Sequence, residues 1–186
     1  RQRQMCIRDR VIASKDPDLI LPPASITKIM TSYLAFTELK NKTMGLQDEV
    51  LVSKNAWQTG GSKMFIEVGK KVKIQELLHG IITTSGNDAS VAMAEHISGN
   101  EETFAIYMNQ MADSLGMNDT SYANSTGLPN DDLYTTARDI SLLARALIKN
   151  FPKEYKLYSQ KEYVFNEIKI ATSYGKSGGA FVTWYR

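Results

Sequence analysis

The stretch Leu21-Pro22-Pro23-Ala24-Ser25-Ile26-Thr27-Lys28 marks the start of a helix that is central to the predicted fold. Two consecutive prolines stop regular strand pairing, and proline is favoured at the beginning of a helix. From Ile26 to Leu39 the apolar residues cover much of the helix circumference. Such a distribution is typical of a helix that is buried on nearly every side. We therefore expect the other elements of the domain to pack around this helix.

Ser25 and Lys28 lie three residues apart at the beginning of that helix, so they share one face. Free backbone N–H groups at a helix start favour a developing oxyanion, and burial lowers the pKa of a lysine until it can act as a base. The pair therefore has the spacing of a nucleophile and its base. The pattern is short, however, and Ser173-Tyr174-Gly175-Lys176 repeats it. The alternative is that Ser25 caps the helix and Lys28 extends to water.

Ser85-Gly86-Asn87 is a second candidate, because it interrupts two apolar helices. A serine hydroxyl can relay a proton, and an asparagine amide can bind a substrate carbonyl. The alternative is a turn followed by a helix cap. Ser98-Gly99-Asn100 has the same letters, but Glu101 and Glu102 follow it at the start of an amphipathic helix. We therefore interpret Asn100 as an N-cap.

The remaining pattern predicts a helix-rich domain with short strands towards both ends. A capping box is expected at Thr136 and Asp139. Too few strands are predicted for a complete sheet. Strands are expected near 11–14, 50–52, 63–67 and 163–170, and further helices near 74–82, 88–97, 101–115 and 137–147.

Composition excludes several classes of function. The chain has 186 residues, which fits one domain or part of a larger one. Four Arg and one Asp in residues 1–10 leave the remainder with a net charge of −1, so nucleic acid is not an expected partner. No apolar run could span a membrane and no signal peptide is visible. Cys6 is alone, and His79 and His96 fit no metal-ligand spacing and are expected to be partly exposed.

Five blocks of the sequence resemble the low-molecular-mass serine D-alanyl-D-alanine carboxypeptidases, which are penicillin-binding proteins of peptidase family S11. The order and spacing of the blocks agree across about residues 11–170. The first contains Ser25 and Lys28, and the third has the S-G-N form of the family's second motif. The blocks are residues 21–31, 56–65, 85–90, 124–129 and 134–139.

The resemblance implies an α/β (α+β) fold of the serine transpeptidase and β-lactamase type, with an antiparallel sheet, here incomplete, and a helical cluster. It implies hydrolysis of the terminal D-Ala–D-Ala bond of peptidoglycan pentapeptides, and acylation by β-lactams. Ser25 would form the acyl-enzyme and donate an oxyanion N–H, Lys28 would be the base, Ser85 would pass the proton on, and Asn87 would hold the substrate amide. No metal or organic cofactor is implied.

The family's third motif, K-T-G, has only Lys176-Ser177-Gly178 as a match, which makes Lys176 a candidate substrate ligand. We expect residues 1–10 to be foreign or disordered, 11–170 to be a partial catalytic domain, and 171–186 to be a divergent tail. The family is extracytoplasmic and reaches the membrane through a C-terminal anchor that is not visible here. A chain lacking the third motif should have little activity. A β-lactamase and an inactive penicillin-binding homologue remain the alternatives.

Overall fold

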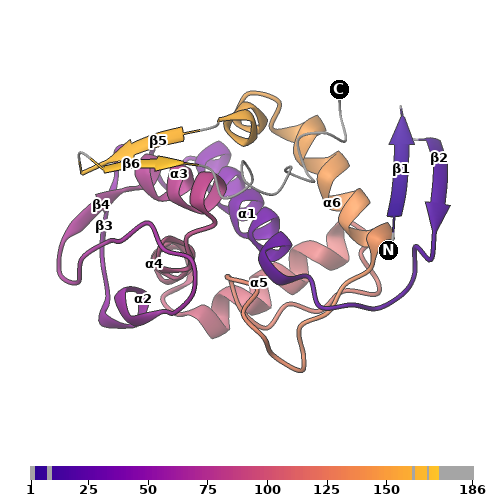
Figure 1. Ribbon diagram of the computed structural model, residues 1–186, viewed down its shortest axis with the longest axis horizontal. Helices are drawn as coiled ribbons and strands as arrows, with labels where there is room; N and C mark the ends of the chain where they lie inside the picture. The colour runs from indigo at the N-terminus through magenta and orange to yellow at the C-terminus, as the bar shows by residue number, and fades with distance from the viewer. Residues whose placement is uncertain (1–2, 8–9, 161, 167, 172–186) are drawn as a thin grey trace.

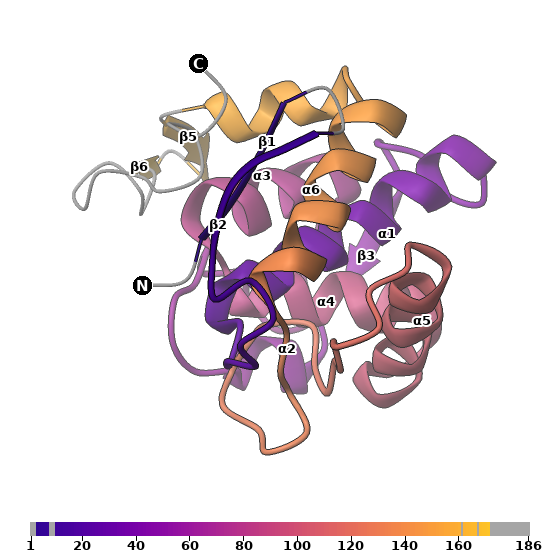
Figure 2. The same cartoon turned by 90° about the vertical axis from the view of Figure 1, so that its right-hand side faces the viewer.

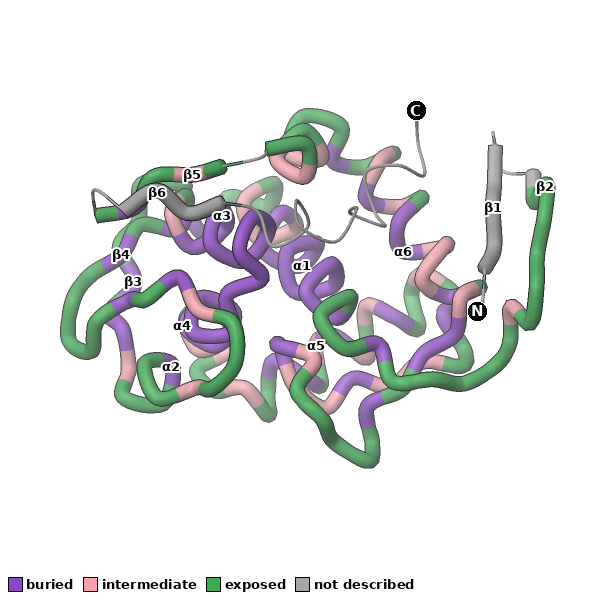
Figure 3. Tube along the Cα trace, in the orientation of Figure 1, coloured by how far each residue is buried: buried purple, intermediate pink, exposed green. Residues whose placement is uncertain are grey.

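The computed structural model describes residues 3–7, 10–160, 162–166 and 168–171. Helix α1 (Lys28–Asn41) passes through the middle of the molecule, preceded by the 3-10 turn Ala24–Thr27 (Figure 1). Residues 28–36 are buried without interruption, as Figure 3 shows along the helix. The prediction of a central buried helix is therefore confirmed.

Four helices pack around α1, and the last two of them begin at side-chain caps. Asn100 accepts a hydrogen bond from Thr103 N (2.7 Å), which confirms its interpretation as a cap. Thr136 accepts from Asp139 N (3.2 Å), but the Asp139 carboxylate binds Asp119 N rather than completing the box. The helices are α3 (Ile74–Thr84), α4 (Asn87–Ser98), α5 (Glu101–Ser114) and α6 (Ala137–Asn150).

The described strands form three separate two-stranded antiparallel sheets. Figures 1 and 2 show the first pair beside α6 and the last pair beside α3. The pairs are β1 (Arg3–Ile7) with β2 (Arg10–Lys15), β3 (Glu49–Leu51) with β4 (Lys71–Lys73), and β5 (Glu162–Phe165) with β6 (Ile168–Ala171). The expected domain boundaries at residues 10 and 170 stay predictions.

Two strand predictions are corrected, and the sequence also missed the strands β1 and β4 and one short helix. Residues 63–67 form no strand, because the buried Asp88 carboxylate accepts from Met64 N (2.9 Å) and Ile66 N (3.2 Å). Residues 163–170 form a hairpin rather than one strand, and Asn166 reverses the chain at a φ of 47°. Asparagine tolerates that conformation better than most residues. Helix α2 (Lys54–Gln58) was not predicted, although Ser53 caps it through Ala56 N.

The segment that leads into α1 is held in place by residues more than a hundred positions later. The backbones of Leu21 and Thr135 exchange two hydrogen bonds, of 2.9 and 3.0 Å. The Arg138 guanidinium binds both carboxylate oxygens of Asp18, which lowers the pKa of that carboxyl group. The start of α6 therefore fixes the path of the chain just before Ser25.

Candidate functional site

Ser25 lies exposed on the 3-10 turn immediately before α1. Neither the turn nor α1 has a side-chain cap hydrogen bond, so the interpretation of Ser25 as a helix cap is wrong. Ala24 has a φ of 47°, an uncommon conformation for a residue with a Cβ atom. Strained backbone of this kind is often found at functional sites. The turn presents the Ser25 hydroxyl to solvent on a fixed backbone.

Lys28 is buried, with only 4% of its surface exposed, so it does not extend to water as the alternative interpretation required. Its Nζ donates a hydrogen bond of 2.6 Å to the backbone oxygen of Thr126. Burial lowers the pKa of Lys28 from 10.5 to about 8, since desolvation disfavours the charged amine. Roughly a tenth of such lysines are neutral at pH 7. Lys28 can therefore accept a proton near neutral pH.

Ser25 and Lys28 line the same small cavity, of about 20 Å³. Ile81 and Ile82 of α3 form an apolar wall of this cavity, and Tyr158 also borders it. No hydrogen bond joins Ser25 to Lys28 within the described residues. Catalytic hydrogen bonds are often long before a substrate binds. The structure brings the two predicted residues together beside an apolar wall.

The loop Asn124–Leu128 supplies the acceptor for Lys28 and lies close to the nucleophile turn. Asn124 Oδ1 accepts from the backbone nitrogens of Thr126 (3.1 Å) and Gly127 (2.7 Å). Gly127 has a φ of 83°, and a Cβ atom there would lie 1.8 Å from the Ala24 oxygen. The loop thus touches both the residue before Ser25 and the amine of Lys28. The sequence showed this block only as part of the resemblance, without a role.

Ser85 and Asn87 lie at the junction of α3 and α4, and both are buried. Ser85 ends α3 at a φ of 57°, and its Oγ has no hydrogen-bond partner in the described part of the chain. An unpaired buried hydroxyl of this kind calls for an explanation, and a catalytic role is one of those available. Asn87 Nδ2 donates to Gly60 O (2.7 Å), and Asn87 N donates to Ser62 O (2.7 Å). Neither side chain caps α4, so the interpretation of the second motif as a cap is wrong.

Ser85 and Asn87 are not hydrogen-bonded to Ser25 or Lys28 among the described residues, although α1 packs directly against both α3 and α4. Asp88 connects the junction to the loop that binds Asn87, through the backbone nitrogens of residues 64 and 66. Lys176, the candidate for the third motif, lies outside the described residues, as does Ser173. The joint action of the four described candidates therefore remains a proposal.

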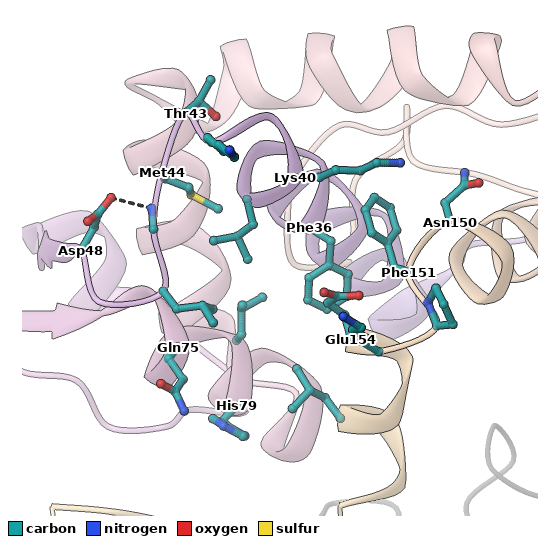
Figure 4. A pocket seen from close by; sticks show the side chains of 18 residues that line it. Phe36, Lys40, Thr43, Met44, Asp48, Gln75, His79, Asn150, Phe151 and Glu154 are labelled. Atoms are coloured by element: carbon teal, nitrogen blue, oxygen red, sulfur yellow. Dashed lines mark hydrogen bonds between the residues drawn. The ribbon is translucent and has the colours of Figure 1, made fainter.

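A larger cavity, of about 1030 Å³, lies at the other end of α1. Figure 4 shows Phe36 and Lys40 on its α1 side and His79 on its α3 side. Lys40 lies roughly 20 Å along the helix from Ser25, given a rise of about 1.5 Å per residue. The cavity is therefore separate from the candidate site.

His79 is buried rather than partly exposed, which corrects the prediction. The β5–β6 hairpin covers it: its ring stacks on Tyr163 at 4.4 Å, and Nδ1 lies 2.7 Å from Gln160 Oε1. His96 is exposed, where partial exposure was expected. Among residues that the structure describes, no cluster of three or more His, Cys, Asp or Glu side chains could hold a metal ion. Within the same residues, no helix has the length and apolar character that crossing a membrane requires.

Comparison with known proteins identifies the family of the chain. The family model described as D-alanyl-D-alanine carboxypeptidase, peptidase S11, matches residues 7–180. The carboxypeptidase DacC of Escherichia coli K12 is 41% identical over 166 residues, which are 86% of this chain and 42% of the relative. The chain thus spans less than half the length of that curated relative.

Solved structures show the same similarity. The carboxypeptidase DacD of Francisella tularensis superposes with a TM-score of 0.85 at 42% identity, over 92% of this chain and 41% of that one. Penicillin-binding protein 5 of Haemophilus influenzae also gives 0.85, at 37% identity, over 88% and 48% of the two chains. The expected transpeptidase-type fold is confirmed, and the chain belongs to the S11 family of D-alanyl-D-alanine carboxypeptidases.

Proposed function

We propose that the full-length protein is a serine D,D-carboxypeptidase that removes the terminal D-alanine from peptidoglycan pentapeptides and is acylated by β-lactams. One observation carries the proposal: a buried lysine with a pKa of about 8 follows an exposed serine by one helical turn. The names of the relatives, which include D-alanyl-D-alanine carboxypeptidases and a penicillin-binding protein, support the substrate and the inhibitor class. The protein would act outside the cytoplasmic membrane, where peptidoglycan lies.

In the proposed reaction, Ser25 Oγ attacks the carbonyl carbon of the penultimate D-alanine while Lys28 Nζ takes the hydroxyl proton. The oxyanion would be stabilised by the backbone N–H of Ser25. Ser85 would pass the proton to the leaving nitrogen of the terminal D-alanine, and the carbonyl would stay bound to Ser25. Asn87 would hold the substrate amide. Water would then release the shortened peptide from Ser25 and restore the enzyme.

We expect fluorescent penicillin to label the full-length enzyme at Ser25. Ser25 has an exposed hydroxyl one helical turn before a base, whereas Ser85 is buried and has Asp88, not a lysine, three residues after it. Mass spectrometry of a digest would locate the adduct, and turnover of a D-Ala–D-Ala peptide would be measured in parallel. An adduct at Ser173 or Ser85 would contradict the proposal. Labelling without D-alanine release would favour an inactive homologue, and fast release of opened penicillin would favour a β-lactamase.

Asn87→Ala and Asn100→Ala should separate catalysis from capping, because both asparagines end a Ser-Gly-Asn triplet. Asn100 only caps α5, so its loss should lower the free energy of unfolding by about 1 kcal/mol and spare D-alanine release. Asn87→Ala should lower D-alanine release by roughly ten- to a hundredfold, since a misplaced substrate can reduce the rate about a hundredfold. Thermal melting and D-alanine release assays would be run on both variants. The opposite pattern would assign the second motif to residues 98–100.

A further inference from the structure

We propose that Glu101, at the start of α5, is a positioning residue that holds the loop Asn124–Leu128 and thereby keeps the Thr126 carbonyl on Lys28. The inference rests on the proposed function, since it assigns a role to Glu101 in the same reaction. Glu101 is 24 residues from Ser125, and the sequence pattern indicated only that it complements the dipole of its own helix. The structure gives it two contacts of a different kind.

The Glu101 carboxylate holds Ser125 through a double contact. Its Oε1 accepts hydrogen bonds from Ser125 N (2.9 Å) and from Ser125 Oγ (2.6 Å). Ser125 is fully buried, and its carbonyl oxygen accepts from Thr31 Oγ1 (2.7 Å) on α1. Hydrogen bonds to a carboxylate are stronger than those between neutral groups. Ser125 is therefore fixed between α5 on one side and α1 on the other.

The position of Ser125 decides where the next carbonyl lies. The peptide group that follows Ser125 is planar, and Thr31 and Asn124 hold its two ends. The Thr126 oxygen then meets Lys28 Nζ at 2.6 Å. Asn124 belongs to the loop itself, whereas Glu101 ties the loop to α5. The covalent backbone of Ser125 and Thr126 thus joins two hydrogen-bonded contacts, that of Glu101 with Ser125 and that of the Thr126 oxygen with the Lys28 amine.

The loop carbonyl affects both the orientation and the titration of Lys28. A neutral amine that donates to Thr126 O has its lone pair held in a fixed direction, which a base needs when it accepts the Ser25 proton. The same carbonyl also stabilises the ammonium form, because it accepts a hydrogen bond from the charge. Burial alone lowers the pKa of Lys28, and Tyr158 is the other titratable group that lines its cavity among the described residues. Loosening the carbonyl should therefore lower the pKa further and misdirect the amine.

Glu102 offers a matched control for the helix dipole. It lies in the same first turn of α5 and carries the same charge, but it is exposed and makes no hydrogen bond to the loop within the part of the chain that the structure describes. If Glu101 acted only by stabilising the N-terminus of α5, Glu101→Ala and Glu102→Ala would have similar effects. If Glu101 acts through Ser125, the two variants will differ in the acylation of Ser25.

The experiment measures the rate of penicillin acylation of the full-length enzyme from about pH 5 to about pH 10, where the base titrates. Glu101→Ala should lower the maximal rate by roughly ten- to a hundredfold, since a displacement of about 1 Å has effects of that size. Its acidic limb should move to lower pH than in the wild type. Glu101→Gln keeps an oxygen that can accept both bonds, so it should restore most of the rate and the profile. Glu102→Ala should resemble the wild type in both respects.

Equal pH profiles for Glu101→Ala and Glu102→Ala would overturn the positioning role while leaving the proposed function intact. A wild type that is not acylated at Ser25 would overturn the proposed function itself. If Glu101→Ala does not fold, Ser125→Ala replaces it, because it removes the Oγ bond and keeps the N–H bond. Ser125→Ala should then shift the acidic limb in the same direction by a smaller amount, and an unshifted limb would contradict the proposal.

Discussion

Replacing Lys28 by arginine should lower the rate of Ser25 acylation by roughly a hundredfold to ten-thousandfold, the range that a general base contributes. Arginine retains the positive charge but does not lose its proton at a working pH, so it cannot accept one from Ser25. The rate of penicillin acylation in the full-length enzyme would test this directly. Near-normal acylation of Lys28→Arg would rule out the role of base, because only the charge would then matter.

The pH dependence should differ between the two proteins. In the wild type, the acylation rate should rise as pH increases through about 8, where Lys28 loses its proton. The arginine variant should show no such rise. Lys63→Arg is a matched control, because Lys63 also donates to a backbone carbonyl, that of Trp57 (2.6 Å), but lies in a more exposed position. That variant should keep the profile of the wild type.

The lowered pKa of Lys28 also predicts how the free energy of unfolding depends on pH. Measuring that dependence tests the same residue without a substrate. Below pH 8, Lys28 is protonated in the folded and the unfolded chain, so burial of the charge opposes folding fully. Between about pH 8 and pH 10.5, only the unfolded chain binds that proton, so stability should rise with pH. The rise attributable to Lys28 is about 3 kcal/mol at most, from about 1.36 kcal/mol per pKa unit. Lys28→Arg should lack this contribution.

The long helices were predicted well because their signal is local. The apolar stripe from Ile74 to Ile82 and the cap at Asn100 each lie within one element, and the structure has α3 and α5 there. The strand prediction for residues 63–67 was wrong because it rested on their apolar side chains. In the structure, backbone N–H groups of this segment donate to a carboxylate in α4 instead. The predicted exposure of His79 was wrong for the same kind of reason, because a hairpin some eighty residues later covers its side chain. Contacts between distant residues override local pattern in both cases.

In the candidate site, too, the residues linked by local spacing could be predicted from the sequence, whereas those linked by contacts between distant residues could not. Ser25 and Lys28 could be paired from sequence, because helical spacing alone places them on one face, and burial of Lys28 follows from the apolar girth of α1. Thr126 could not be found, because it acts through a backbone oxygen, 98 residues from Lys28, and any residue type carries such an oxygen. Glu101 was visible only as a favourable charge at a helix start. The glycine of the same loop did carry a usable signal, since it follows two hydroxyl residues and precedes Leu-Pro in a turn.

Gly127→Ala should be among the most damaging single substitutions in the loop, both for stability and for acylation. The added Cβ would lie 1.8 Å from the Ala24 oxygen and 2.4 Å from the Ala24 carbon, which are backbone atoms that cannot rotate away. The loop and the nucleophile turn must then separate by roughly 1 Å or more, and a displacement of that size can lower a rate about a hundredfold. Ser25 and the Thr126 carbonyl that accepts a hydrogen bond from Lys28 are both adjacent to the clash. The acylation rate should therefore fall by more than the loss of stability alone explains.

Gly99→Ala separates this clash from ordinary backbone strain. Gly99 has nearly the same φ, 82° against 83°, but no atom lies within 4 Å of its hypothetical Cβ. An alanine in this conformation should lower the free energy of unfolding by about 1–2 kcal/mol. Gly127→Ala should add about 1–3 kcal/mol for overpacking. Chemical denaturation and penicillin labelling would be measured on both variants. Equal losses of stability, or full labelling of folded Gly127→Ala at the wild-type rate, would show that the loop does not press on the turn that carries Ser25.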